Sequence, residues 1–445
     1  MKTKISALHI PHNKNTAAMN AVAISAPAEV LLPMNMHGGA PAVPVVEVGD
    51  YVRIGQMVAK EEGRNSVPVH ATISGTVTAI EEMKISGAPT TVIRIAGDGK
   101  MEKDPTLTPK NPENLDEFLT ILRDSGIVGL GGAAFPLWAK LDAARKNHIK
   151  TVLVNGAECE PYITSDHRTM VENADLVVRG VQILKKFLDS EEFVIGIEDN
   201  KPDAIAKLKE LFKDMPYVNV KPLKAVYPQG AKQVLLYNAA GLVAKEGQRL
   251  ASLGVIIINV TTLAKMALYL DTGMPLVDKI VTVDGAAIAE PKNLIVPIGT
   301  PIQNLVDECG GLKGDVGKII IGGPMMGKTT DSLESPVIKA CNALLVFDEK
   351  ASKALEPSAC IHCGRCVEAC PLNLNPTAYS KAMEIEDEEL RYQILTEENV
   401  SMCMACGCCA YVCPAHKPLV TTNNQAKSFV RKMKAAKEPK KEGGK

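Results

Sequence analysis

The chain has few aromatic residues, almost no net charge and no long apolar run. Aromatic residues make up 4% of its 445 residues, so its cores must be mainly aliphatic. The formal net charge of −1 gives no reason to expect nucleic acid as a partner. No stretch of about 18 uncharged apolar residues occurs, and the first residues lack the apolar core of a secretory signal. We therefore expect no transmembrane segment, so that any link to a membrane runs through another protein.

The length indicates the number of domains, and the cysteine content indicates the redox compartment. A chain of this length suggests about two to four domains, and 46% hydrophobic residues supply material for real cores. Three of the cysteines, Cys159, Cys309 and Cys341, lie far apart and show no disulfide framework. Free cysteines of this kind indicate a reducing compartment.

Eight of the twelve cysteines form two copies of one pattern. Each copy reads Cys-x2-Cys-x2-Cys-x3-Cys-Pro, which is typical of [4Fe–4S] clusters. In ferredoxins with two such runs, the fourth cysteine of each run ligates the other cluster. The predicted ligands are Cys360, Cys363, Cys366 and Cys413 for the first cluster, and Cys403, Cys406, Cys409 and Cys370 for the second.

The alternative to clusters is a pair of structural zinc sites, which also use four thiolates. Zinc sites usually show two separated Cys-x2-4-Cys pairs rather than a triplet followed by Cys-Pro, so the spacing favours clusters. Cys408 adds a ninth thiol inside the second run. We interpret it as a bystander rather than a ligand.

The rest of the chain predicts a multidomain α/β protein with additional small β domains. Short strands and turns fill residues 29–100, where VGDYVRIGQMVA and VHATISGTVTAI are similar to the two halves of a barrel-sandwich. Helix-like and strand-like segments then alternate from 127 to about 267, which indicates an α/β domain. The expected helices cover 115–124, 203–212 and 302–308, and the expected strands cover 151–155, 193–197, 280–285 and 293–301.

A glycine-rich segment, Gly126-Ile-Val-Gly-Leu-Gly-Gly-Ala-Ala-Phe-Pro136, contains a formal G-x-G-x-x-A match. A dinucleotide-binding fingerprint must follow a strand, whereas a helical pattern precedes this segment. We therefore reject that interpretation and predict a phosphate cradle, because closely spaced glycines let backbone N–H groups approach phosphate oxygens. Pro136 fits the start of a following helix. The alternative is a loop used only for chain reversal.

A second segment, Val154-Asn-Gly-Ala-Glu-Cys-Glu-Pro161, follows a buried strand. It places Glu158 and Glu160 on one side of an extended chain. Carboxylates at this place are suited to accept hydrogen bonds from ribose hydroxyls or a carboxamide.

The two segments resemble the flavin- and NADH-binding signatures of the flavoprotein subunit of respiratory complex I. That family has a GRGGAGFP loop and an N-x-x-E-x-E-P element. With QGAKQ at 229–233, INVTTLAKM at 258–266 and the paired cysteine runs, residues from about 5 to 425 closely resemble the RnfC subunit of Rnf complexes. Those complexes couple ferredoxin oxidation, NAD reduction and ion transport across a membrane.

The resemblance implies a domain order and a set of site residues. The domains are a barrel-sandwich over 1–105, an FMN- and NADH-binding α/β domain over 115–275, a β-grasp (soluble-ligand-binding) domain over 276–350, a ferredoxin-like α domain with two [4Fe–4S] clusters over 351–425 and a disordered basic tail over 426–445. Gly129, Gly131, Gly132 and Lys140 would line the FMN phosphate and ring; Asn155, Glu158, Gly230 and Asn259 would complete the flavin pocket; Phe135 would stack on the nicotinamide; and Glu160 would hold NADH. Ala134 stands where the family has glycine, so we expect a left-handed backbone or a crowding methyl group there.

The resemblance also implies partners and a route. Electrons would pass between NAD(H), FMN, the two clusters and an iron–sulfur subunit of a membrane-bound, ion-translocating complex. The chain would lie peripherally on the cytoplasmic face of the membrane. The alternatives are a cobalamin reductase or a proline-reductase electron carrier built from similar modules, and a flavin-free iron–sulfur scaffold.

Overall fold

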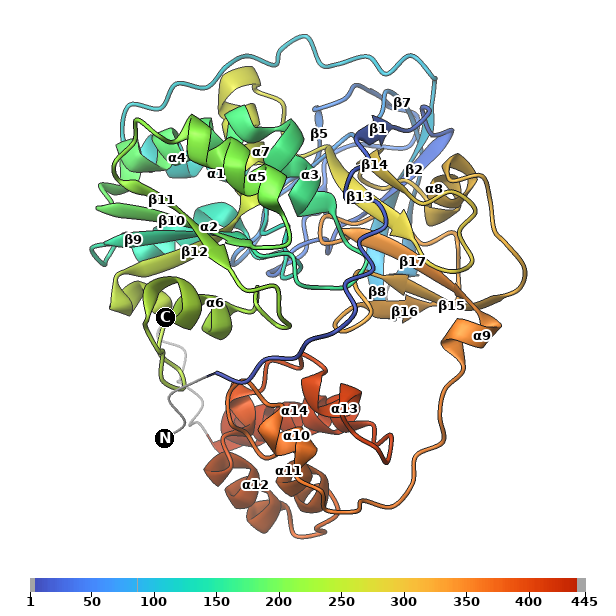
Figure 1. Ribbon diagram of the computed structural model, residues 1–445. Coiled ribbons are helices and arrows are strands. Elements are labelled where there is room, and N and C mark those ends of the chain that lie inside the picture. Colours follow the sequence, from blue (N-terminus) through green and yellow to red (C-terminus); the bar gives the residue numbers. More distant parts are fainter. Residues whose placement is uncertain (1–4, 86, 438–445) are drawn as a thin grey trace. The chain divides into compact units, whose positions relative to one another are not determined.

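The computed structural model describes residues 5–85 and 87–437 (Figure 1). The chain divides into two units, each with its own core. The large unit comprises His12–Lys224 and Arg249–Lys353. The small unit comprises residues 5–11, Ala225–Gln248 and residues 354–437.

One layer of the large unit is a four-stranded parallel sheet. Its strands run in the order β11-β10-β9-β12, with β9 at Thr151–Gly156, β10 at Glu192–Glu198, β11 at Val218–Leu223 and β12 at Val255–Asn259. All three pairings are parallel. Figure 1 shows α1 (Leu115–Asp124), α4 (Ala174–Leu188), α5 (Pro202–Leu211) and α7 (Val260–Thr272) gathered on one face of this sheet. The strands β9, β10 and β12 are largely apolar, as expected for a buried parallel sheet.

The strand order contains a switch point. From β9 the chain proceeds to β10 and then β11 on one side, and it later returns to place β12 on the other side of β9. In open α/β sheets, ligands bind in the crevice at the carboxyl ends of the strands where the order reverses. The expected binding site therefore lies at the carboxyl ends of β9 and β12, a place that we call the crevice.

The predicted secondary structure of this region is largely confirmed. The expected helix over 115–124 is α1, and Asn114 caps it by accepting the backbone N–H of Glu117. Pro136 precedes α2 (Leu137–Ala144) as predicted. The expected strands over 151–155 and 193–197 are β9 and β10, and the expected helix over 203–212 is α5.

Two small antiparallel sheets form the barrel-sandwich region. One has the order β2-β8-β7-β4, from β2 (Glu29–Pro33), β8 (Ala88–Gly97), β7 (Gly75–Ile85) and β4 (Tyr51–Val52). The other has the order β3-β5-β6, from β3 (Val43–Pro44), β5 (Met57–Lys60) and β6 (Val69–His70). The indole N–H of Trp138 in α2 donates to the Ser66 carbonyl at 3.1 Å, which joins this region to the α/β layer.

A six-stranded mixed sheet completes the large unit. Its order is β1-β14-β13-β17-β15-β16, from β1 (Ala21–Ala23), β14 (Lys292–Pro297), β13 (Asp278–Asp284), β17 (Ala343–Asp348), β15 (Val316–Ile321) and β16 (Lys328–Thr330). Two helices accompany it, α8 (Ile302–Glu308) and α9 (Glu349–Ser352). The expected strands over 280–285 and 293–301 are β13 and β14, and the expected helix over 302–308 is α8. The expected strand over 293–301 is shorter than predicted, because β14 ends at Pro297.

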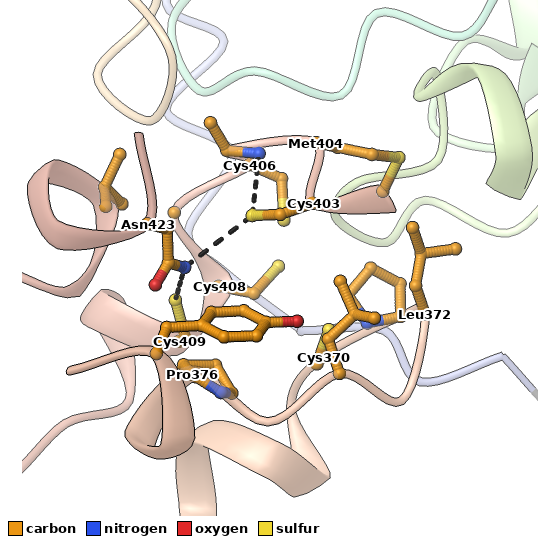
Figure 2. Close-up of a pocket in the computed structure, with 15 residues that line it drawn as sticks. Cys370, Leu372, Pro376, Cys403, Met404, Cys406, Cys408, Cys409 and Asn423 are labelled. Carbon is orange, nitrogen blue, oxygen red and sulfur yellow. Dashed lines mark hydrogen bonds between the residues drawn. The ribbon is translucent and has the colours of Figure 1, made fainter. Parts of the chain in front are cut away.

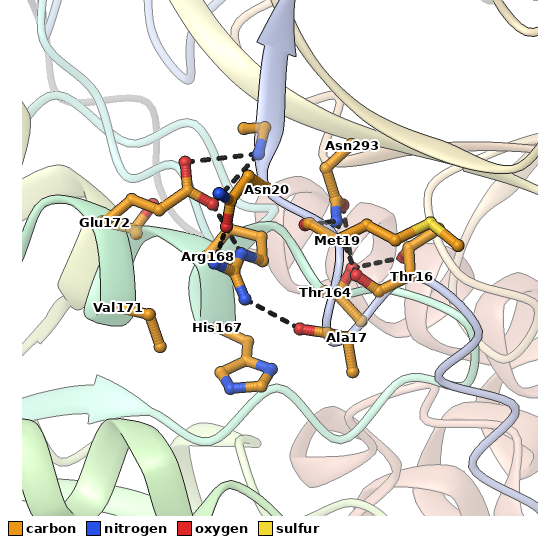
Figure 3. Close-up of polar contacts among 12 residues, drawn as sticks. Thr16, Ala17, Met19, Asn20, Thr164, His167, Arg168, Val171, Glu172 and Asn293 are labelled. Carbon is orange, nitrogen blue, oxygen red and sulfur yellow. Dashed lines mark hydrogen bonds and ion pairs between the residues drawn. The ribbon is translucent and has the colours of Figure 1, made fainter.

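Residues 16–23, which we call the strap, tie the N-terminal part of the chain to this sheet (Figure 3). Its last residues, Ala21–Ala23, pair with β14 in parallel. Arg168 of α3 (Ser165–Glu172) donates to the Ala17 carbonyl and to the Asn20 side chain at 2.9 and 2.8 Å. The structure thus distributes the predicted 1–105 domain over the two small sheets, the edge of the six-stranded sheet and, for residues 5–11, the small unit.

The small unit is almost entirely helical. Its elements are α6 (Lys232–Ala240), α10 (Arg365–Glu368), α11 (Pro376–Ala382), α12 (Glu388–Glu397), η2 (Val400–Met402), α13 (Cys408–Tyr411) and α14 (Leu419–Lys437). Ala225–Gln248 belongs to this unit rather than to the α/β layer, and within it Tyr227 pairs with Leu8 as an isolated bridge. A short helix η1 (Leu250–Leu253) follows this segment in the large unit.

The predicted disordered tail needs correction. Residues 426–437 are the second half of α14, because Ala426 and Val430 recur on one face and pack into the core of the small unit. Residues 438–445 lie outside the described part of the chain. Among the described helices, none combines the length and apolar content that crossing a bilayer demands.

Candidate functional site

The cysteines that the crossed ligation assigns to the first cluster line one pocket. Its wall contains Cys360, Cys363, Cys366 and Cys413, together with residues such as Thr377, Lys417 and Leu419. Gly364 has a φ of +74° at the start of α10, so the loop turns sharply between the second and third cysteines. The run therefore contributes its first three thiols to this pocket, and the fourth comes from the other run.

The other four predicted ligands line a second pocket (Figure 2). Cys403, Cys406 and Cys409 come from the second run, and Cys370 comes from the end of the first run. Gly407 repeats the turn of Gly364, with a φ of +83° at the start of α13. The two loops are thus built alike, and the structure brings together the two predicted sets of four thiols.

The second pocket carries hydrogen-bond donors for its sulfurs. The Asn423 side-chain N–H group points at Cys403 Sγ and Cys409 Sγ at 3.6 and 3.8 Å (Figure 2). The Oδ1 atom of this buried amide has no partner among the described residues, so the amide is oriented by the sulfurs alone. A donor pair buried among thiols fits thiolates that carry negative charge, as cluster ligands do.

The thiols do not converge as the ligands of one ion would. Across residues 5–85 and 87–437, no group of three or more His, Cys, Asp or Glu side chains is close enough to hold a single metal ion. A four-iron cube takes each thiolate on a different iron, so its ligands stand further apart than those of one zinc ion. The geometry fits the cube better than the zinc alternative.

The two pockets differ in exposure. Cys360 and Cys363 of the first pocket are exposed, whereas Cys406 and Cys409 of the second pocket are buried. The extra thiol, Cys408, is 1% exposed and lies in the wall of the second pocket. Burial of the second loop is completed by Tyr227, whose hydroxyl donates to the Cys406 carbonyl at 2.6 Å.

The crevice of the parallel sheet contains two asparagines in register. Asn155 lies near the end of β9 and Asn259 ends β12, and the two are paired across the strands. The Asn155 side chain accepts the backbone N–H of Ala157 at 3.1 Å. Asn259 caps α7 by accepting the backbone N–H of Thr262 at 3.1 Å. The switch point thus presents two amides beside the N-terminus of a 13-residue helix.

The glycine loop folds over the N-terminus of α7. It is closed by paired hydrogen bonds between Gly129 and Phe135 and between Ala134 and Gly129, at 2.8 and 3.1 Å. The Leu130 N–H donates to the Thr262 hydroxyl at 2.8 Å. Gly131 lies against Asn259, because a Cβ at Gly131 would be 3.2 Å from Asn259 Nδ2.

The loop has the features on which the phosphate-cradle prediction depends. Gly131 and Gly132 are exposed, and nothing lies within 4 Å of a Cβ built on Gly132. Exposed backbone N–H groups beside a helix N-terminus are a favourable environment for a phosphate. Ala134 adopts a φ of +46°, the left-handed conformation expected from its place in the loop. This conformation costs an L-residue about 1–2 kcal/mol.

The remaining predicted flavin residues are placed less directly. Lys140 donates from Nζ to the Ile257 carbonyl at 2.9 Å, and Phe135 is half-buried at the end of the loop. Gly230 belongs to the small unit, so the structure gives no position for it relative to the loop. Their contacts with a cofactor remain predictions.

Glu158 and Glu160 have different surroundings. The Glu158 carboxylate caps α3, accepting the backbone N–H groups of Asp166 and His167 at 2.7 and 3.3 Å. Glu160 accepts the Met325 N–H at 3.0 Å, and its other oxygen is buried without a partner among the described residues. Burial raises the pKa of Glu160 to about 7, against the opposing effect of the Met325 and Met326 N–H groups.

Two residues near the crevice were missed by the sequence analysis. Lys14 is half-buried and donates from Nζ to the carbonyls of Glu158, Glu160 and Ile163. Burial lowers the pKa of Lys14 to about 8. Asp166 lies in the first turn of α3 and accepts from Asn259. No local pattern marks Lys14, whereas the Thr164-Ser165-Asp166 run before a helical stretch is an ordinary helix-start signal.

Comparison with known proteins assigns each region. Models for four families match: the RnfC barrel sandwich hybrid domain over residues 4–100, the Nuo51 FMN-binding domain over 122–268, the SLBB domain over 280–329 and the 4Fe-4S dicluster domain over 355–417. The predicted fold class is confirmed. With the glycine loop and the thiol pockets, these matches define a flavin- and iron–sulfur-containing electron-transfer protein, whose cofactors are FMN and [4Fe–4S] clusters.

Curated relatives identify the family. The chain is 39% identical over 374 residues to the C subunit of the Na(+)-translocating ferredoxin:NAD(+) oxidoreductase complex of Acetobacterium woodii, covering 83% of this chain and 84% of that protein. It is also 39% identical over 385 residues to the proton-translocating counterpart of Clostridium ljungdahlii, covering 85% and 84%. The chain belongs to the RnfC family of these ion-translocating oxidoreductases. It is therefore an electron-transfer subunit of an Rnf complex, which contains several subunits.

A solved structure is similar in fold. The crystal structure of an NAD+-reducing [NiFe]-hydrogenase in the H2-reduced state matches with a TM-score of 0.51 at 16% identity, covering 71% of this chain and 63% of that chain. At this identity the likeness concerns the fold alone.

Proposed function

We propose that this subunit exchanges electrons between NAD(H) and a one-electron partner subunit, by way of FMN and the two [4Fe–4S] clusters. The observation that carries the proposal is the presence of two kinds of site in one chain. A glycine loop suited to a phosphate lies at the switch point of the parallel sheet, and two pockets are each lined by four thiols of the predicted sets. The relatives from A. woodii and C. ljungdahlii are named ferredoxin:NAD(+) oxidoreductase subunits.

The large unit has the groups needed to bind and orient a flavin mononucleotide and a nicotinamide nucleotide. The N–H groups of Gly131 and Gly132 and the N-terminus of α7 are suited to the phosphate, and the amides of Asn155 and Asn259 are suited to ring oxygens and nitrogens. Bound FMN supplies the conversion between a two-electron hydride and single electrons. Hydride transfer needs no side-chain acid or base, so the residues of the crevice position rather than catalyse.

The exposure of the thiols in the small unit supports an order in which electrons pass the two clusters. Because Cys360 and Cys363 are exposed, a partner's redox centre can approach the first cluster closely. In the second pocket Cys406, Cys408 and Cys409 are buried. We therefore assign the first cluster to exchange with the partner and the second to the interior of the relay.

The remaining parts of the assignment concern the whole complex. The relatives are named as subunits of Na(+)- or proton-translocating complexes, so we place the chain in a translocase. Ion movement would belong to other subunits. We propose that this chain is a peripheral subunit on the cytoplasmic face, where NADH is available, and that it transfers electrons to an iron–sulfur subunit.

Anaerobic titration of the purified chain with NADH tests the proposal. We expect the flavin absorbance to bleach first and the cluster absorbance to follow, with each NADH delivering two electrons. An Asn259→Ala variant is the matched test of the site, and it should bind FMN more weakly while keeping its iron. A protein that holds its full iron and flavin yet stays unbleached with NADH contradicts the NAD(H) assignment. An Asn259→Ala variant with normal flavin content contradicts the proposed location.

A further inference from the structure

One carboxylate beside the crevice, that of Asp166, holds a residue that contacts the glycine loop. Asp166 Oδ2 accepts the Asn259 side-chain N–H at 2.7 Å, and Asp166 Oδ1 accepts the Thr261 hydroxyl at 2.6 Å. Its own backbone N–H is held by Glu158 at 2.7 Å. Asp166 thus connects the first turn of α3 with the first turn of α7.

These contacts fix both ends of the Asn259 amide. Its Nδ2 donates to Asp166, and its Oδ1 accepts the backbone N–H of Thr262. A side-chain amide that is free to rotate can exchange its donor and acceptor ends. With a carboxylate on one side and a helix N–H on the other, the amide has one orientation, which leaves its second N–H hydrogen for a ligand.

The fixed amide supports the glycine loop. A Cβ on Gly131 would be 3.2 Å from Asn259 Nδ2 and 3.4 Å from its Cβ, so the loop packs directly on this side chain. Thr262 donates its backbone N–H to Asn259, and its hydroxyl accepts the Leu130 N–H. A rotation of Asn259 would therefore disturb both the amide at the switch point and the position of the loop.

We infer that Asp166 is a positioning residue of the flavin site, which holds the Asn259 side chain in the orientation that binds FMN. The inference rests on the proposed location of the flavin. The carboxylate is well suited to this role, because its two oxygens receive two donors from the α7 end, Asn259 and Thr261. Thr261 is also in contact with the Thr169 hydroxyl at 2.8 Å.

The Asp166→Asn variant tests the inference through FMN affinity. An asparagine has a single acceptor oxygen, so it cannot serve both donors, and the Asn259 amide gains freedom to rotate. We expect the FMN dissociation constant of flavin-depleted protein, measured by quenching of flavin fluorescence, to rise about tenfold or more. The matched control is Asp203→Asn. Asp203 contacts His167, the next residue of α3, at 2.8 Å, so this control should leave FMN binding unchanged.

A reciprocal exchange separates positioning from simple structural support. In Asp166→Asn combined with Asn259→Asp, the hydrogen bond can form again with its direction reversed, and an aspartate remains a good cap for α7. We expect the unfolding temperature, followed by the fluorescence of Trp138, to return to the wild-type value. FMN affinity should not return, because a carboxylate at 259 has no N–H to offer and repels an anionic ligand.

The outcomes are separable. Wild-type affinity in Asp166→Asn overturns the inference, and so does recovery of both affinity and unfolding temperature in the exchanged pair. Wild-type affinity in Asn259→Ala would instead overturn the proposed location of the flavin. Weaker FMN binding in Asn259→Ala with normal binding in Asp166→Asn overturns the positioning role alone.

Discussion

The thiol pockets of the small unit and the crevice of the large unit are built on opposite principles. Each pocket depends on four side chains of one kind, and those side chains are the chemical donors. The crevice depends mainly on backbone: two exposed glycines, the end of α7 and two amides at the strand ends. A site made of side chains should fail completely when one is removed, whereas a site made of backbone should weaken in steps.

The largest expected effect is on the thiol pockets. Replacing Cys413 with alanine should abolish the first cluster, held by Cys360, Cys363 and Cys366, and leave the second cluster in place, because Cys413 lines the first pocket. Iron content should fall by about half, and resonance spectra should retain one [4Fe–4S] signal. Cys408→Ser is the control within the same run and should keep both signals. Loss of the second signal instead of the first would refute the crossed ligation.

The crevice should respond in a graded way. In Gly131→Ala, the added methyl group meets Asn259 at 3.2 Å, so the loop or the amide must shift slightly. We expect FMN affinity to fall about tenfold, which corresponds to about 1.4 kcal/mol. Fluorescence titration of flavin-depleted protein measures the change. Complete loss of flavin at unchanged unfolding temperature would mean that a single change abolishes binding here, as it does in a thiol pocket.

A pH-dependent effect is expected at Glu160. Its folded pKa of about 7 lies above the ordinary glutamate value, so folding takes up a proton in the interval between them. The contribution of this group to stability is present below the ordinary pKa and is lost as pH rises through about 7. Unfolding of the large unit, followed through Trp138, should therefore occur at lower temperature at about pH 7.5 than at about pH 5.5.

In Glu160→Gln, the difference in unfolding temperature between about pH 5.5 and about pH 7.5 should shrink by about 2–4 °C. If Glu160 also holds NADH, the same variant should raise the KM for NADH several-fold at normal flavin content. Equal loss of flavin would place Glu160 in the flavin pocket instead. An unchanged pH profile would show that the buried carboxyl does not titrate in this range.

The smallest effect should be electronic. The Asn423 amide approaches two thiol sulfurs of the second pocket, and such donors stabilise the more negative, reduced cluster. Asn423→Leu should lower the reduction potential of the second cluster by tens of millivolts, on the order of one hydrogen bond. Potentiometric titration with resonance detection resolves the two clusters, and the first should not move. A shift of both would point to a general loosening of the small unit.

The same contrast explains what the sequence could predict. The spacing of the cysteines was sufficient to group Cys370 with the second run, because the chemistry is in the residue type. Strands β9 and β10 and helix α1 followed from apolar patterns and an N-cap. The resemblance located the glycine loop and Asn259, but not the acceptor that orients Asn259.

Long-range contacts account for the remainder. Asp166 meets Asn259 93 positions away, and Lys14 reaches the Glu158 carbonyl across 144 positions. No local sequence pattern predicts contacts between residues so far apart in the chain. The predicted disorder of residues 426–437 is wrong for a related reason. Their lysine-rich composition is typical of disordered segments, whereas Ala426 and Val430 pack into the core of the small unit. Tertiary packing stabilises a helix that composition alone would not.

The strap has a consequence for biosynthesis. The Thr16 carbonyl accepts from Asn293, 277 positions further along, and Ala21–Ala23 can join the sheet only after β14 exists. At about 5–20 residues per second, a ribosome needs roughly 14–55 s to make that stretch. During this time the strap must wait without its partner strand, so a segment that emerges early is among the last to be locked in place. A chaperone that shields nascent chains would have to bind this end of the molecule for the longest time.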